Sequence, residues 1–157
     1  CKPVLGCDIS MAIHTPHGMG TREGEWCAVG PEPDLPGAQR EEDGCSGVIE
    51  SAPLTDAVEI LGAPVLRLRL SADQPNAFIV ARLNDVAPDG ASTRVIYGVL
   101  NLTHRESHEL QKHLPSGETY DIRLQLNDIA QIIAVGHRIR IHLTNSKWPQ
   151  FLPSQDL

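Results

Sequence analysis

Three histidines close together in the sequence have the type and spacing of residues that could bind a metal ion. His104, His108 and His113 lie in the stretch HRESHELQKH, and on a helix the first two would share one face, as zinc ligands often do. The zincin motif needs a Glu directly after its first His, however, and Arg105 occupies that position. Pro115 would also end a helix soon after the third histidine. The segment therefore predicts a solvated loop between two strands, and we expect no metal site here.

A nucleophilic serine is the next candidate, but its usual setting is missing. The strand-to-helix turn G-x-S-x-G does not occur in the chain, and GCSG at residues 44–47 is the nearest match. That stretch has a different spacing and no helical pattern after it, so Ser46 is predicted to be an ordinary loop residue. We therefore expect no catalytic residue within this chain.

Phosphate and calcium motifs are missing as well. Neither G-x-x-x-x-G-K-[ST] nor G-x-G-x-x-G precedes a helical pattern, which argues against a nucleotide site. Asp85 and Asp89 lack the spacing of an EF-hand loop, and the sequence Pro88-Asp89-Gly90 is typical of a turn between strands. We expect no cofactor.

The charge and the cysteines limit the class of protein. The 157 residues contain 13 Lys and Arg against 20 Asp and Glu, for a formal net charge of -7. Because nucleic-acid binders usually carry a basic surplus, we expect no nucleic-acid partner. No apolar run is long enough to span a bilayer, so we expect no membrane partner either. The lack of C-x-x-C spacing favours reduced thiols in a cytoplasmic protein over a disulfide among Cys1, Cys7, Cys27 and Cys45.

Most of the chain after Gly47 alternates between apolar and polar residues, which is the pattern of strands with one buried face and one solvated face. Strands are predicted in six stretches, which are residues 47–54, 64–73, 76–86, 93–104, 118–126 and 137–145. Residues 127–136 (NDIAQIIAVG) are predicted to be a connection with room for one helical turn. Because no long window has helical spacing, the pattern indicates an antiparallel sandwich or barrel rather than a parallel sheet.

The first forty-odd residues differ from the rest because they are rich in Gly, Pro and charge and have no regular period. We predict a single domain in which residues 1–46 form an irregular, loop-rich opening segment and residues 47–157 form the body of the sandwich. The chain starts without a Met and ends without a capping element. We therefore read it as an excised domain whose sandwich is truncated at its C-terminal end.

The last predicted strand lies within HRIRIHLTNSKWP at residues 137–149 and is expected to be apolar inside and basic outside. Its basic residues, including His142, would then face water. His137 and Arg138 are accordingly given structural roles. Trp148 is expected to plug the end of the sandwich, because large aromatic side chains dominate packing.

Four stretches that occur in a fixed order resemble one protein family. They are EWCAVGPEPDLPGAQREEDG, APLTDAVEILGAPVLRLRLSAD, ARLNDVAPDGASTRVIYGVLNLTHRESHE and LPSGETYDIRLQLNDIAQIIAVGHRIRIHLTNSKWP, and the resemblance runs from about Trp26 to Pro149. Together they resemble the C-terminal domain of the X-Pro dipeptidyl-peptidase and cocaine-esterase-like (CocE/NonD) serine hydrolases. The sequence departs from the family at Ser116, where Pro is common, and at Gly37 and Glu42 in the acidic loop.

The resemblance implies a jelly-roll β-sandwich akin to galactose-binding domains, packed against an α/β-hydrolase domain of the same polypeptide. That domain would hold the Ser, His and Asp of an acyl-enzyme mechanism. The triad is therefore expected upstream of Cys1, and the chain alone is expected to be inactive. The parent would be a dipeptidyl-peptidase or an acyl esterase, with this domain supporting and partly covering the active site.

The loop from Trp26 to Arg40 is expected to face the hydrolase domain or its substrate, because it is long, irregular and anchored by an aromatic residue. The candidate contact residues are Trp26, Asp34, Gln39 and Arg40. Three alternatives stay open at this point. The loop could simply close one end of the sandwich, and the chain could be a free-standing jelly-roll module that binds carbohydrate or another ligand. The chain could also be an independent small enzyme with a metal site built on the histidine segment. A homo-oligomer is also compatible with the sequence.

Overall fold

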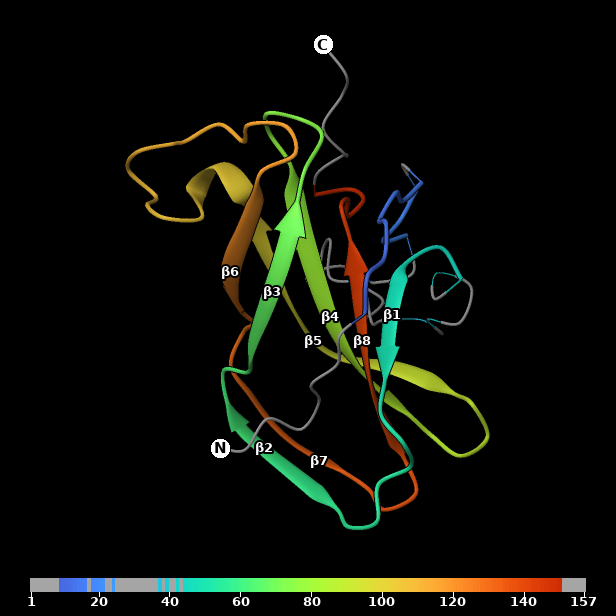
Figure 1. Cartoon of the computed structure of the whole chain (residues 1–157). Helices are drawn as coiled ribbons and strands as arrows, with labels where there is room; N and C mark the ends of the chain where they lie inside the picture. The colour runs from blue at the N-terminus through green and yellow to red at the C-terminus, as the bar shows by residue number, and fades with distance from the viewer. Residues whose placement is uncertain are drawn as a thin grey trace, which may run out of the picture.

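The computed structural model describes residues 9–16, 18–21, 24, 37, 39, 42 and 44–150, and eight strands lie within this part of the chain (Figure 1). The strands are β1 (Gly47–Glu50), β2 (Val58–Gly62), β3 (Val65–Ser71), β4 (Phe78–Val86), β5 (Ser92–Asn101), β6 (Thr119–Gln125), β7 (Ile129–Ile133) and β8 (Arg138–Thr144). One short 3-10 helix, η1 (Leu102–His104), follows β5. The predicted all-β, antiparallel sandwich is confirmed. No helix in the described residues is long and apolar enough to span a lipid bilayer.

Four strands form one layer of the sandwich, in the order β1-β8-β4-β5. The connection from β4 to β5 is the turn predicted at Pro88-Asp89-Gly90. The Ala87 N–H donates to the Ala91 carbonyl at 2.9 Å, and the Asp89 carboxylate accepts from the Ala91 N–H at 2.9 Å. Gly90 has a φ of 84°, a left-handed conformation that Gly adopts without strain. The predicted turn is thus confirmed.

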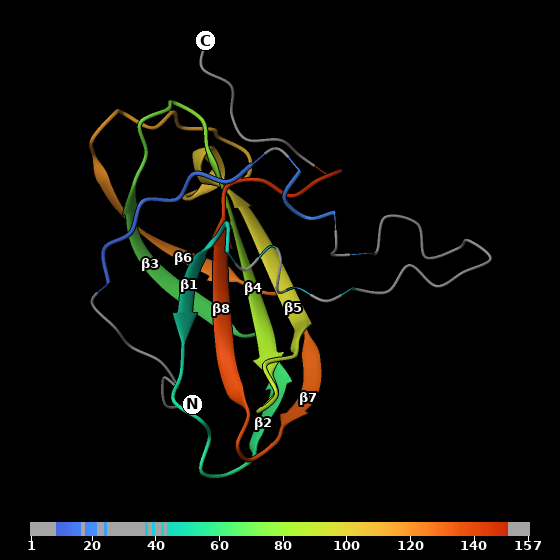
Figure 2. The ribbon, with the colours of Figure 1, turned by 90° about the vertical axis from the view of Figure 1, so that its right-hand side faces the viewer.

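The other layer is a long, bent ribbon of two paired chain segments (Figure 2). β3 pairs with β6 and β2 pairs with β7, and the chain bends between the two pairs at Gly62 (φ 104°) and Pro64. The Leu126 N–H donates to the Pro64 carbonyl at 2.9 Å at this bend. The prediction of a connection at residues 127–136 is therefore wrong, because Ile129–Ile133 forms β7. Its partner β2 is distant in the sequence, so no local pattern indicates the pair.

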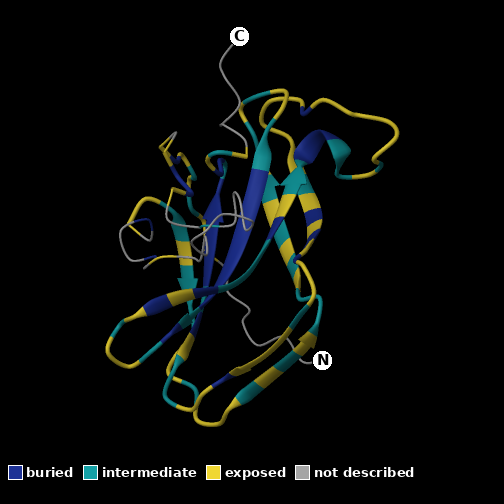
Figure 3. Ribbon diagram, turned by 180° about the vertical axis from the view of Figure 1, so that it is seen from behind, coloured by how far each residue is buried: buried dark blue, intermediate teal, exposed yellow. Residues whose placement is uncertain are grey.

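The core lies between the two layers and consists of aliphatic side chains that alternate along the strands. Its buried members are Ile79, Ala81, Leu83, Leu102, Leu114, Ile122, Leu124, Leu126, Ile133, Ile139, Ile141 and Leu143. β4 is buried on both faces, as its largely dark colour in Figure 3 shows. One face of this strand contacts the core, and the other is covered by chain segments from outside the sandwich.

Gly98 allows the two layers to approach closely at one side of the sandwich. A Cβ at this position would lie 2.8 Å from the Gln125 carbonyl oxygen and 2.8 Å from a methyl carbon of Leu126. The Asn127 N–H also donates to the Tyr97 carbonyl at 3.1 Å. β5 therefore meets the end of β6, and the sandwich is closed along this side.

Candidate functional site

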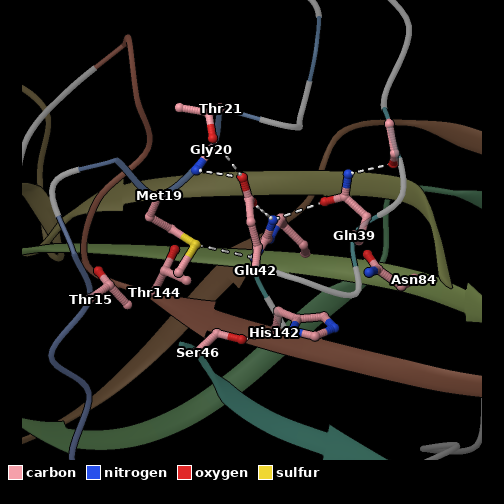
Figure 4. A network of polar contacts seen from close by, with 12 residues as sticks. Thr15, Met19, Gly20, Thr21, Gln39, Glu42, Ser46, Asn84, His142 and Thr144 are labelled. Carbon is pink, nitrogen blue, oxygen red and sulfur yellow. Dashed lines mark hydrogen bonds and ion pairs between the residues drawn. The ribbon is translucent and has the colours of Figure 1, made fainter. Parts of the chain in front are cut away.

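The outer face of the four-stranded sheet is polar, yet it is buried. Arg82 and Asn84 of β4 and His142 of β8 are each 0% exposed, and Thr144 of β8 is 1% exposed. They are covered by residues from distant parts of the chain, which include Thr15, Met19, Gln39, Glu42 and Ser46 (Figure 4). Buried polar groups need specific partners, so this covered face is the candidate site.

Arg82 and Glu42 form the centre of the site. The Arg82 Nη1 donates to Glu42 Oε2 at 2.8 Å and to Gln39 Oε1 at 3.0 Å. The side chains of the ion pair are 0% and 8% exposed. Glu42 Oε1 accepts from the backbone N–H of Gly20 at 3.2 Å and from the Thr21 hydroxyl at 3.4 Å. One carboxylate thus joins the sheet to another segment of the chain, and we call these five residues the polar clasp.

The polar clasp holds both ends of the segment between Thr21 and Gln39 at the same ion pair. A buried ion pair adds little net stability compared with an apolar pair, because two charges must leave water. Removing one partner is different, because it leaves a buried charge and costs about 3–5 kcal/mol. The clasp therefore fixes the positions of Gly20, Thr21 and Gln39 beside the central strand.

Ser46 and His142 also meet on this face, with the Ser46 Oγ 2.8 Å from His142 Nδ1. Burial, followed by the positive charges of Arg82 and Arg140, lowers the pKa of His142 to about 3. A general base works best when its pKa is near the operating pH, so this imidazole is too weak a base to activate the serine. The carboxylate of Glu42 is held by Arg82. The contact between Ser46 and His142 is therefore structural.

His137 and Arg138, which the sequence predicts to be structural, contact neighbouring strands at the start of β8. His137 Nδ1 lies 2.7 Å from Asp85 Oδ1, and the Arg138 Nη1 donates to Glu50 Oε1 at 3.0 Å. The Arg140 Nε also donates to Glu50 Oε2, at 2.6 Å. Polar side chains thus tie β8 to β4 on one side and to β1 on the other.

Two expectations for the last strand are wrong. The alternation predicts His142 on a wet face, but this side chain is fully buried because distant segments cover that face. Trp148 is 46% exposed and does not plug the sandwich, whereas Lys147 is only 1% exposed. The Lys147 Nζ lies 4.6 Å from the centroid of the Tyr97 ring, where a cation–π contact replaces hydration. The Trp148 N–H donates to the Met19 carbonyl at 2.5 Å, so this residue is anchored through its backbone.

The structure describes one of the four predicted interface residues. Trp26, Asp34 and Arg40 lie outside the described residues. Gln39 is 0% exposed, its amide oxygen accepts from Arg82, and its amide nitrogen donates to a backbone carbonyl at 2.9 Å. The prediction that Gln39 faces a hydrolase domain or a substrate is therefore wrong, because this side chain is buried in the polar clasp.

Sequence reasoning misses the polar clasp, although Arg82 carries a signal. It is the one charged residue in the apolar run AFIVARL. A charge inside a strand that is apolar on both faces needs a buried partner. Nothing local identifies that partner as Glu42, which lies in the charged run REEDG, a pattern typical of a solvated loop.

The histidine segment brings two imidazoles together. His104 and His108 stack with their ring centroids 5.8 Å apart. Among the residues that the structure describes, no group of three or more His, Cys, Asp or Glu side chains is arranged to hold an ion. Cys45 is a free, exposed thiol, and the other three cysteines lie outside the described ranges. Reduced thiols and a cytoplasmic location stay predictions.

Comparisons with known proteins extend this picture. A family model of the X-Pro dipeptidyl-peptidase C-terminal non-catalytic domain matches residues 10–156. The chain is also 29% identical over 98 residues to the cocaine esterase of Rhodococcus sp. (strain MB1 Bresler), a match that covers 62% of this chain and 17% of that protein.

Two solved structures share the fold over most of the chain. An aminopeptidase from the marine sediment archaeon Thaumarchaeota archaeon matches with a TM-score of 0.71 at 23% identity, over 82% of this chain and 23% of that chain. An alpha-amino acid ester hydrolase matches with a TM-score of 0.69 at 25% identity, over 76% of this chain and 21% of that chain. The chain therefore spans less than a quarter of the length of each of these relatives.

Proposed function

Because this chain belongs to the family of X-Pro dipeptidyl-peptidase C-terminal non-catalytic domains, we propose that it is the supporting β-sandwich of a larger serine hydrolase. The catalytic serine, histidine and aspartate would lie in an α/β-hydrolase domain of the same polypeptide. The lengths of the relatives support this proposal, since the chain covers 17% to 23% of each of them. The parent enzyme would hydrolyse ester or peptide bonds through an acyl-enzyme.

The single observation that carries the proposed supporting role is the polar clasp. Glu42 binds Arg82 of the central strand and, at the same time, Gly20 and Thr21 at the other end of the loop. A loop whose two ends are attached to a rigid sheet can present its outer residues at a defined position, as docking and active-site loops do. The loop that begins after Thr21 is therefore assigned to contact with the hydrolase domain.

Trp26, Asp34 and Arg40 are the candidate contact residues of that loop. Aromatic and arginine side chains are enriched where protein surfaces meet, which favours the first and the last of them. In this arrangement the domain supports the hydrolase domain and covers part of its active-site mouth. Gln39 contributes only by holding the loop to Arg82.

Activity-based labelling tests the proposal that this chain is non-catalytic. The whole hydrolase polypeptide and the 157-residue chain are each treated with a fluorophosphonate and assayed on a p-nitrophenyl ester. We expect label and hydrolysis in the whole polypeptide and neither in the chain. Ser46→Ala is the matched control, and it should leave both results unchanged. Labelling of Ser46 itself would contradict the proposal.

A free-standing carbohydrate-binding module is the alternative with less support. Such sites use several exposed aromatic rings, but cations cover both tyrosine rings of this chain. That leaves Trp148, which is 46% exposed, as the only large aromatic side chain that is exposed among the described residues. Arg94 and Lys147 lie 5.1 Å and 4.6 Å from the Tyr97 centroid, and Arg105 lies 4.4 Å from that of Tyr120. Retention of the chain on a glycan array would favour this alternative.

A further inference from the structure

The core is less covered along β3 than along β6. On β6 the inward side chains of Ile122 and Leu124 are 5% and 2% exposed. The inward side chains of β3 are only partly buried, and they are Leu66, Leu68 and Leu70. The close approach of β5 to β6 at Gly98 closes the other side of the sandwich. Among the residues that the structure describes, the side at β3 is therefore the one where a further element could bury apolar surface.

β3 is also an edge strand in the described part of the chain. It pairs with β6 alone, in a two-stranded sheet. The peptide groups on its other edge therefore have no strand partner among the described residues. A two-stranded ribbon is marginally stable by itself, and a free edge is a template for another strand.

The outward face of this ribbon is basic, although the chain as a whole has a net charge of -7. Arg69 is paired with Asp121, and the Arg69 Nε donates to Asp121 Oδ1 at 2.9 Å. Arg67 lies directly opposite Arg123 in the strand register, and like charges at such positions destabilise a sheet. A hollow of about 670 Å³ is lined by Arg67, Leu68, Arg69, Asp121, Ile122 and Arg123. This face therefore has both the room and the charge to receive a carboxylate.

We propose that the free edge of β3 binds an extended segment of a partner polypeptide in which apolar residues alternate with Asp or Glu. Main-chain hydrogen bonds to β3 supply affinity, as in other cases of strand addition. The apolar side chains of the segment cover the inward row Leu66, Leu68 and Leu70. An acidic side chain placed beside Arg67 offsets the repulsion between Arg67 and Arg123.

Charge favours such a segment over a second copy of this chain. Two β3 edges paired with each other would bring Arg67 and Arg69 of one copy beside the same arginines of the other. Charged residues on edge strands are a common protection against this kind of self-pairing. Binding at this edge depends only on the geometry and charge of the ribbon, whether or not the chain is part of a larger hydrolase.

A labelled peptide of the same length as β3, seven residues, tests the proposal. Val alternates with Glu in this peptide, and a control peptide has Lys in place of Glu. Binding to the 157-residue chain is measured by fluorescence anisotropy at low ionic strength, and hydrogen exchange reports which amide protons are protected. We expect the Glu peptide to bind, to protect β3, and to bind more weakly as salt is added.

Charge reversal at Arg67 distinguishes charge-dependent peptide binding at β3 from a loss of binding caused by unfolding. Arg67→Glu should weaken binding of the Glu peptide about five-fold and strengthen binding of the Lys peptide about five-fold. Lys112→Glu makes the same change of charge at an exposed site outside β3 and β6, and it should alter neither affinity. Equal binding of the two peptides, protection of a different strand, dimers formed through β3, or no peptide binding at millimolar concentration would each overturn the proposal.

Discussion

Removing one partner of the buried ion pair between Arg82 and Glu42 is expected to destabilise the fold strongly. In Glu42→Leu the guanidinium of Arg82 keeps its positive charge at 0% exposure and loses a carboxylate oxygen 2.8 Å away. The Gly20 N–H loses its acceptor as well. A buried charge without its partner costs about 3–5 kcal/mol, and the unpaired N–H places the expected loss near the upper end of that range.

The double variant Arg82→Met/Glu42→Leu is expected to recover much of this loss. It removes both charges and fills the site with apolar side chains, and such replacements of buried ion pairs are often neutral or stabilising. The two single changes should therefore not add. A double-mutant cycle should give a coupling energy of about 2–3 kcal/mol between the two positions.

Urea unfolding followed by far-UV circular dichroism measures these free energies. Asp121→Asn is the matched control, because it breaks the exposed pair with Arg69 and should leave the free energy of unfolding almost unchanged. A loss of less than about 1 kcal/mol in Glu42→Leu would refute the reasoning, because a solvated loop carboxylate behaves in that way. Additive effects of the two single changes would refute it as well.

Two other outcomes concern pH and packing. The pKa of His142 is lowered from 6.5 to about 3, so below about pH 6.5 the unfolded chain binds a proton that the folded chain does not. The free energy of unfolding should therefore fall by up to about 1.4 kcal/mol per pH unit as the pH drops below 6.5 toward 3. His142→Gln should lose this pH dependence when its stability is measured by urea titration at several pH values. An unchanged pH dependence in this variant would show that other groups cause it. Gly98→Val should destabilise by about 1–3 kcal/mol because its side chain meets the Gln125 carbonyl. Gly18→Ala, with nothing within 4 Å of its Cβ, should have no effect on thermal unfolding, and equal stability of the two variants would contradict the close approach of the layers.

Patterns between near neighbours were enough to predict most of the fold. In a strand, residues two apart face the same side, so the alternation of Ile122, Leu124 and Leu126 predicts the inward row that the structure buries along β6 and at the residue after it. The turn between β4 and β5 follows from Pro88 and Gly90 alone. β2 and β7 are the two strands that this reasoning misses, because each gains its strand structure by pairing with the other, which is distant in the sequence.

The sequence by itself determined six of the eight described strands, the inward sides of β3, β6 and β8, the turn and the family, because all of these depend on the order of residues along the chain. Only the tertiary structure decided that Arg82 and His142 are buried, that Gln39 supports the clasp, and that Trp148 lies at the surface. The physical reason is that the second face of a strand is solvated or buried according to which other segments of the chain cover it. Here the covering segments are far away in the sequence, and no pattern around Arg82 predicts that Glu42 is its partner.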